Sequence, residues 1–370
     1  MIEAVNPAYG FDLLDRDAGE QLGRINRACP IEADFTFYFD RGRDFFAWAD
    51  HAFDSYRYIG IRCGEDLVGY GMIGVNQGQV GSKQLPLSYL GDWRILPGHR
   101  GHSLGQQAAE ALAAHLPREA KHGYCLVKRG NAPVEWMFRT RSAAHWTARP
   151  LCSFAVVNLL FLFRPGMPRR HQVRRARPDD VEVMAEITRQ AWRGRLFAPL
   201  VTASGLAADL ERLEREETGG YYVAKRGDRI VGLLRAWDSH AVRRTVVLGY
   251  TRRGQLIRQA VAAAGRLLRH LAPLPGRGEA FRTLTLHRVA VPGDDPAVLR
   301  DLLLAVLREH HGRGYHMAHL GLCGGDPLAA AARMLPAQRF VSDIHLITRR
   351  GIDPPEPKPG QVPWIDLERI

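Results

Sequence analysis

The chain has 370 residues, more than one hydrophobic core usually holds, so its length favours two domains. Apolar residues make up 46% of it and charged residues 24%, which excludes a disordered protein. The formal charge is +12, from 51 basic and 39 acidic residues, but arginines spread along the whole chain supply nearly all of it. The charge therefore identifies no particular anionic partner.

The first half, residues 1–165, is predicted to contain a strand, helices, a two-stranded hairpin, a long strand, a helix and further strands. Gly64–Gly69 has the turn residues of the hairpin. A polar, proline-flanked and arginine-rich stretch at 164–171 follows, and we interpret it as a linker.

The second half, residues 171–350, repeats this order. Gly227–Gly232 matches the first hairpin turn, and Leu96–Gly98 and Val291–Gly293 end the long strand of each half with the same apolar-Pro-Gly step. We interpret the halves as an internal duplication. The fold class predicted is α/β (α+β), with a mixed sheet and helices on both faces.

Two segments fall outside this repeat. Residues 252–271 form a basic run with an apolar stripe at helical spacing, and we interpret it as an inserted packing helix. Residues 351–370 hold five prolines and are predicted to extend across the surface without chemistry.

The sequence suggests neither a disulfide framework nor a metal site, because its five cysteines stand far apart. It shows no targeting segment, and its longest apolar run is too short to cross a bilayer. We therefore expect a cytoplasmic protein with no membrane partner.

Tyr89–Gly105 carries the clearest chemistry. It is predicted to be a strand, a loop of small residues and then a helix, whose apolar positions include Leu104, Ala108 and Leu112. A helix N-terminus offers unpaired N–H groups and a positive dipole end, and small residues let a pyrophosphate approach them. Plain helix capping by Ser103 is the alternative explanation.

This segment resembles the pyrophosphate loop of the GNAT superfamily of acyltransferases. Arg100, Ser103 and Gly105 stand where that family has arginine or glutamine, glycine, and glycine or alanine. Serine in place of the middle glycine keeps a small side chain but would strain a left-handed backbone.

The resemblance covers most of residues 10–165 and implies two GNAT-like domains in tandem. It implies a cofactor site for acetyl-CoA, the acyl donor, at Trp93, Arg94, Ile95, Arg100, Gly101, His102, Ser103, Leu104, Gly105 and Asn131.

The second half resembles the family less closely. Its loop holds Asp294 and Asp295, and two carboxylates would repel a pyrophosphate. We therefore expect a degenerate second domain and one active domain, the first.

The resemblance implies direct attack of an uncharged amine on the thioester, with backbone N–H groups stabilising the oxyanion. Asp92 is the candidate general base, and a solvated or ion-paired strand residue is the alternative. Phe138 stands where the family often has a proton-donating tyrosine, so Tyr124, Ser142 or water would have to protonate the thiolate.

Residues 29–54 correspond to the segment that usually sets acceptor specificity in this fold. Asp34, Phe37 and Asp40 are our candidate substrate-binding residues, because acids and aromatic rings suit a cationic or aromatic amine. The alternative is that the aromatic rings belong to the core and the acidic side chains face solvent.

The sequence thus predicts a cytoplasmic N-acetyltransferase that acts on a small-molecule or peptide amine, with nucleic acid unlikely as a partner. One alternative is a tandem-GNAT transferase that uses aminoacyl-tRNA, which would suit the basic inserted helix. Another is a non-catalytic acyl-CoA-binding or scaffold protein. The acceptor, acyl chain length and oligomeric state are not predicted.

Overall fold

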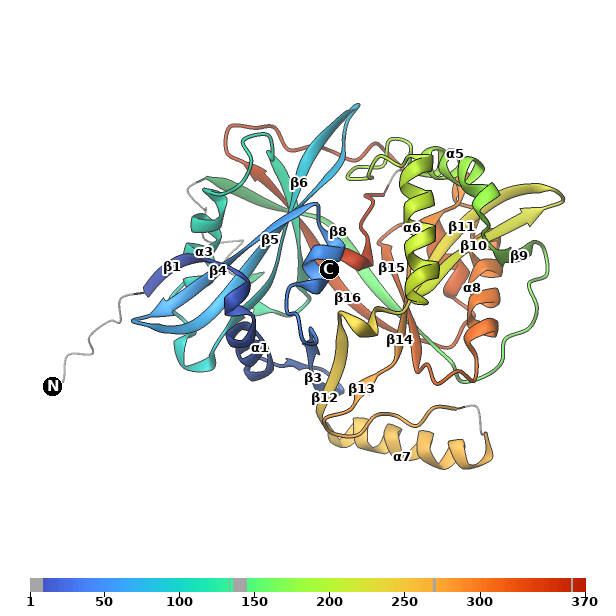
Figure 1. Ribbon diagram of the computed structural model, residues 1–370, viewed down its shortest axis with the longest axis horizontal. Helices are drawn as coiled ribbons and strands as arrows, with labels where there is room; N and C mark the ends of the chain where they lie inside the picture. Colours follow the sequence, from blue (N-terminus) through green and yellow to red (C-terminus); the bar gives the residue numbers. More distant parts are fainter. Residues whose placement is uncertain (1–8, 133, 136–144, 269–270, 361) are drawn as a thin grey trace.

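The computed structural model describes residues 9–132, 134–135, 145–268, 271–360 and 362–370. A long twisted sheet crosses the molecule, and helices cover both of its faces (Figure 1). This agrees with the mixed α/β class predicted from the sequence.

The strands are β1 (Tyr9–Leu14), β2 (Ile31–Glu32), β3 (Phe35–Asp40), β4 (Ser55–Cys63), β5 (Asp66–Val80), β6 (Lys83–Ile95), β7 (His122–Lys128), β8 (Trp146–Leu160), β9 (Gln172–Arg175), β10 (Gly219–Arg226), β11 (Arg229–Trp237), β12 (Arg244–Tyr250), β13 (Ala280–Phe281), β14 (Thr283–Ala290), β15 (Met317–Cys323) and β16 (Ala337–Arg349). The helices are α1 (Gly19–Ala28), α2 (Ala47–Ala52), α3 (Leu104–Ala113), α5 (Val181–Trp192), α6 (Ala203–Glu216), α7 (Arg252–Leu267) and α8 (Pro296–His310).

The large sheet has the strand order β1-β4-β5-β6-β7-β16-β8-β15-β14-β11-β10-β9. The last strand of each half has therefore crossed over: β16 pairs with β7 of the first half, and β8 pairs with β15 of the second. The linker predicted at 164–171 separates the halves in sequence, but the sheet continues through both.

A smaller sheet also joins the halves, with the order β13-β12-β3-β2. Strand β3 of the first half pairs antiparallel with β12 of the second, from Asp40 opposite Arg244 to Phe35 opposite Tyr250.

Both hairpins form at the predicted turns. Gly64 and Gly227 have φ of 64° and 59°, so each turn uses the positive φ that glycine adopts without a steric penalty. The predicted apolar stripe of α3 is buried, because Leu104, Ala108 and Leu112 pack on β4 and β5.

Two expectations about segments were wrong. The stripe of α7 does not pack against the body, since Leu256 and Ile257 are 67% and 43% exposed. The end of the chain does not lie on the surface, because Trp364, Asp366 and Glu368 are buried in the middle of the molecule, where Figure 1 places the C-terminus. No described helix is long and apolar enough to cross a membrane.

Candidate functional site

The parallel strands β6 and β7 separate partway along their length. They pair only from Leu87 opposite His122 to Leu90 opposite Cys125, although both strands continue beyond these pairs. Past this point β6 pairs only with β5 among the described residues, so its other edge has no described partner strand. We call the point of separation the vertex.

A bulge in β6 lies at the vertex. The β5–β6 register shifts between Tyr70 and Met72, and Asp92 adopts a φ of 53° there. Gly71 stands opposite the bulge because a Cβ at this position would lie 2.0 Å from the Trp93 ring. The predicted pantetheine-binding residues Trp93, Arg94 and Ile95 thus occupy the bulge and the separated end of β6.

The predicted pyrophosphate loop leads from this end of β6 into α3. Gly101 and Ser103 have φ of 93° and 57°, and α3 begins at Leu104. Ser103 thus has the left-handed backbone that strains a residue with a Cβ. The first turn of α3, which includes Gly105, directs N–H groups without intrahelical partners toward the loop.

The other loop side chains make local contacts. Arg100 is exposed and donates from Nε to the Ile95 carbonyl over 3.0 Å. The His102 ring packs tilted against Tyr9 with ring centroids 5.6 Å apart, and its backbone carbonyl accepts from the Gln107 side chain over 3.0 Å. Asn131 is exposed in the turn that follows β7, where its backbone N–H donates to the Lys128 carbonyl over 3.0 Å.

Asp92 is held in a buried group of charges. Its carboxylate oxygens lie 3.3 Å from Arg41 and 3.7 Å from Arg94, and its side chain is 5% exposed. Arg243 lies in the same region; burial, together with Arg41, lowers the pKa of its guanidinium to about 9. The geometry agrees with the ion-paired alternative for Asp92, and its role as a base stays a prediction.

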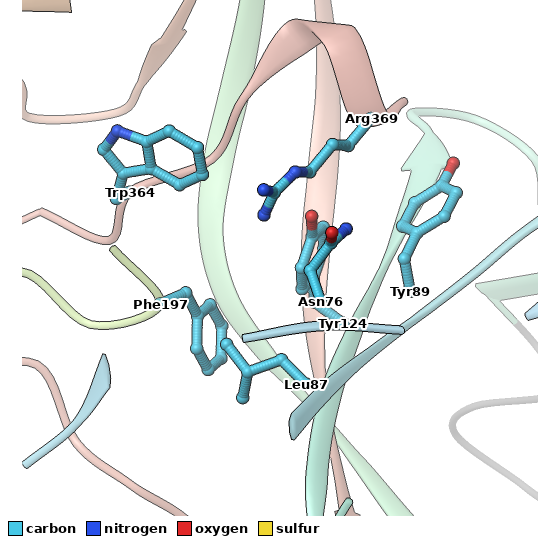
Figure 2. Close-up of a pocket in the computed structure, with 7 residues that line it drawn as sticks. All are labelled: Asn76, Leu87, Tyr89, Tyr124, Phe197, Trp364 and Arg369. Carbon is cyan, nitrogen blue, oxygen red and sulfur yellow. The ribbon is translucent and has the colours of Figure 1, made fainter. Parts of the chain in front are cut away.

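On the far side of the vertex from the loop lies a cavity, which we call the central cavity. It is lined by Asn76, Leu87, Tyr89, Tyr124, Phe197, Trp364 and Arg369, from both halves and the C-terminal segment (Figure 2). Tyr124 packs its ring against Tyr89 and Phe197. Burial raises the pKa of the Tyr124 phenol to about 12, so it remains protonated at neutral pH.

The second half repeats the vertex in β14 and β15. These strands pair from Thr283 opposite Met317 to Leu286 opposite Leu320, and Arg288 occupies a bulge with a φ of 50°. A second cavity at this place is lined by residues 363–367 of the chain itself, together with these strands. Cys323 donates to the Pro363 carbonyl over 3.3 Å, so the C-terminal segment is fixed beside the opening.

The acids of the second loop also have partners. Asp294 forms an ion pair with Arg195, and Asp295 caps α8 by accepting from the Ala297 amide over 2.9 Å. These contacts agree with a degenerate loop in the second half.

The predicted acceptor-binding residues lie in the small sheet between the halves. Asp40 pairs with Arg244, and Asp34 lies 4.0 Å from Arg253. The ring of Phe37 packs between Phe35 and Phe39 at centroid distances of 5.1 and 5.5 Å. Contacts within the chain account for all three side chains, and their part in acceptor binding stays a prediction.

One buried group among the described residues has the geometry of a metal site: His287, Asp366 and Glu368. Arg235 and Arg288 already lie 3.6 and 3.9 Å from the Glu368 carboxylate, so this charge is balanced without an ion. We assign no metal to it.

Sequence reasoning missed the residues that come from elsewhere in the chain, namely Arg41, Phe197, Arg243, Trp364 and Arg369. The mostly buried segment 363–370 holds four apolar residues, Trp364, Ile365, Leu367 and Ile370, and these were the available signal that it is not a surface tail. Phe138 and Ser142, considered in the proton-transfer argument, lie outside the described residues.

Comparisons with known proteins agree with this geometry. Residues 20–139 match the family model described as Acetyltransferase (GNAT) family. Among curated proteins, no sequence match was found.

Among solved structures, N-myristoyltransferase of Saccharomyces cerevisiae with bound myristoyl-CoA is similar over 97% of this chain and 84% of its own, with a TM-score of 0.59 and 12% identity. The GCN5-related glucosamine N-acetyltransferase region of a fungal multi-domain GH3 β-N-acetylglucosaminidase is similar over 93% of this chain and 38% of that one, with a TM-score of 0.60 and 11% identity. Both likenesses concern the fold.

Proposed function

We propose that the protein is an acyl-CoA-dependent N-acyltransferase whose active site lies at the first vertex, because residues 20–139 match the family model described as Acetyltransferase (GNAT) family. One observation carries the proposal: β6 and β7 separate where a bulge precedes an arginine-containing loop at the N-terminus of α3. The loop would bind the pyrophosphate, and the free edge of β6 would bind the pantetheine chain.

The donor we propose is acetyl-CoA. Beyond the vertex, the way for a longer acyl chain is obstructed by packed rings: Tyr89 stacks on Phe53 with centroids 5.8 Å apart and also contacts Tyr124, whose ring stacks on Phe197. The similar fold of a myristoyltransferase makes longer donors the alternative to test.

In the proposed reaction a neutral primary amine attacks the thioester carbonyl carbon. The new C–N bond forms as the carbonyl becomes an oxyanion, and the C–S bond then breaks. Tyr124, whose phenol is protonated at neutral pH, would donate a proton to the departing thiolate. Asp92 or a water would accept the proton that the amine loses.

The second half would then be a partner domain that does not bind acyl-CoA. Its vertex is lined by residues 363–367, and Asp294 stands in the loop where the first half has small residues. We propose the boundaries 1–165 and 171–350 for the two GNAT-like units, which exchange their last strands.

The experiment that tests this function is calorimetric titration of acetyl-CoA, octanoyl-CoA and myristoyl-CoA into the unmodified protein and an Arg100→Glu variant. We expect acetyl-CoA to bind the unmodified protein, and the reversed charge beside the pyrophosphate to weaken binding at least about tenfold. Arg229→Glu, at an exposed hairpin of the second half, is the matched control. Equal binding to all three proteins would place the cofactor elsewhere, and tighter binding of myristoyl-CoA would refute the acetyl donor.

A further inference from the structure

Helix α7 leaves apolar side chains open to solvent at the edge of the molecule. Figure 1 shows it outside the large sheet, next to the small sheet that contains β12. Of the ten large hydrophobic side chains exposed in the described residues, three belong to α7 and the residue after it: Leu256, Ile257 and Leu268, at 67%, 43% and 39%. Single exposed apolar residues are ordinary on a protein surface, whereas a contiguous patch marks an interaction site.

These side chains form such a patch because they share one side of the helix. Each residue turns an α-helix by about 100°, so Ala260 lies between Leu256 and Ile257, and Leu268 continues the line three turns beyond Ile257. Ala260 is exposed as well. We call Leu256, Ile257, Ala260 and Leu268 the exposed stripe.

A different side of α7 packs on the protein. Gly254, Val261 and Gly265 are buried or half-buried and follow one another at helical spacing. A Cβ at Gly254 would lie 2.2 Å from the Asp34 carbonyl oxygen, so the helix touches the body closely here. The contact with the body therefore leaves the exposed stripe uncovered.

Arginines surround the exposed stripe. Residues 251–278 contain six arginines and no acidic residue. Arg252 and Arg266 are exposed, and neither has an ion pair among the described residues. Arg253, 79% exposed in its side chain, has only a distant partner, Asp34 at 4.0 Å. The surface around α7 is thus complementary to an anionic partner.

The helix is held in place before any partner binds. The Thr251 Oγ1 caps α7 by accepting from the Gly254 amide over 3.1 Å, and it donates to the Asp34 carbonyl over 2.9 Å. After the helix, the chain returns to the end of β12, where the Tyr250 hydroxyl donates to the Pro275 carbonyl over 2.8 Å. A preformed helix loses less conformational entropy on binding than a segment that folds at a surface.

A lipid bilayer fits this surface better than other anionic or apolar partners. Nucleic acid would pair with the arginines but leave the exposed stripe in water, and α7 has no aromatic side chain on which a base could stack. A second copy of the chain could cover the stripe with its own, but it would bring the arginines of both helices together. A bilayer offers acyl chains to the stripe and phosphates to the arginines.

We infer that α7 binds the surface of an anionic lipid bilayer, with Leu256 and Ile257 among the acyl chains and Arg252 and Arg266 on the lipid phosphates. A helix that lies along the surface needs no spanning segment. The inference therefore departs from the sequence-based expectation of no membrane partner, which rested on the lack of a spanning run. It does not depend on the proposed acyltransferase function, because neither vertex takes part.

The test is co-sedimentation of the whole chain with two kinds of vesicle, one of phosphatidylcholine alone and one of phosphatidylcholine and phosphatidylglycerol in equal amounts. The double variants are Arg252→Gln with Arg266→Gln, and Leu256→Gln with Ile257→Gln. All four side chains are exposed, so the variants should keep the fold, which circular dichroism checks.

The matched controls are Arg229→Gln and Met334→Gln, which change an exposed arginine and an exposed apolar residue outside α7. We expect the unmodified protein and both controls to bind the phosphatidylglycerol vesicles at least about tenfold more tightly than phosphatidylcholine alone. The arginine variant should bind them roughly 25-fold more weakly, about fivefold for each arginine. The apolar variant should lose at least about tenfold, because its side chains no longer gain from leaving water.

The inference is overturned if the protein does not sediment with the phosphatidylglycerol vesicles. It is also overturned if the apolar variant binds them as tightly as the unmodified protein, since charge alone would then hold the protein. Filter binding of total tRNA and sedimentation velocity complete the test. Without vesicle binding, tRNA binding that the arginine variant loses, or a dimer that the apolar variant loses, would assign α7 to a different partner and refute the lipid surface.

Discussion

Replacing Asp92 by asparagine would remove the carboxylate that balances two buried arginines at the bulge. Asp92 and Arg41 are 5% and 3% exposed in their side chains and lie 3.3 Å apart; Arg94, 14% exposed, lies 3.7 Å away. Removing one partner of a buried ion pair leaves an uncompensated charge, which typically costs about 3–5 kcal/mol. We expect Asp92→Asn to lower the free energy of unfolding by an amount in this range.

The assay is urea denaturation, followed by circular dichroism, of the unmodified protein and the variant. Asp12→Asn is the matched control, because its ion pair with Arg62 over 3.1 Å is partly exposed on both sides and should contribute less than about 1 kcal/mol. If Asp92→Asn loses less than about 1 kcal/mol, the ion-pair reasoning is wrong. If that stable variant also loses acetyl transfer, Asp92 acts as the base.

Two further predictions concern the bulge and the buried charges of the second half. Gly71→Ala places a Cβ 2.0 Å from the Trp93 ring, so we expect the free energy of unfolding to fall by about 1–3 kcal/mol and acetyl-CoA to bind more weakly. Gly10→Ala is the control for both measurements, because a Cβ at Gly10 has no atom within 4 Å. Burial raises the pKa of Asp209, but Arg235 and Arg288 outweigh it and lower the pKa to about 2. This carboxylate therefore stabilises the fold above its ordinary pKa of 3.8 by roughly 2 kcal/mol, and the contribution is lost as the pH falls toward 2. Denaturation of Asp209→Asn at pH 7 and pH 3 should show a smaller deficit at pH 3, and an equal deficit would contradict the linkage.

The loop, the helix that follows it and the hairpin turns could be predicted because neighbouring residues in the sequence determine them. The step from strand to loop to helix at Tyr89–Gly105 depends on Pro97, on small residues and on apolar spacing in α3, all between residues 89 and 112. The replacement of glycine by serine at position 103 was visible in the same stretch, whereas the left-handed φ of 57° at Ser103 comes from the structure. Both hairpin turns were found in the same way, from glycines between apolar runs.

The long-range parts could not be predicted from such signals. Nothing near β8 or β16 in the sequence shows that these strands exchange places, because either one would bury the same apolar face in its own half. The C-terminal segment was misjudged because five prolines outweighed Trp364 and Ile365 in the interpretation. Arg369 therefore had no visible connection with Tyr89, although the two residues line one cavity.

The two bulges explain why one half would bind a ligand and the other its own chain. Both β6 and β14 place a non-glycine residue at a φ near 50°, but the charges are reversed: Asp92 stands among arginines, whereas Arg288 stands beside Asp209 and Glu368. Since Glu368 belongs to the C-terminal segment, the second bulge attracts that segment to the second vertex. The next residue, Arg369, is thereby carried into the central cavity. The charge reversal at the second bulge thus fixes the C-terminal segment where its residues line both cavities.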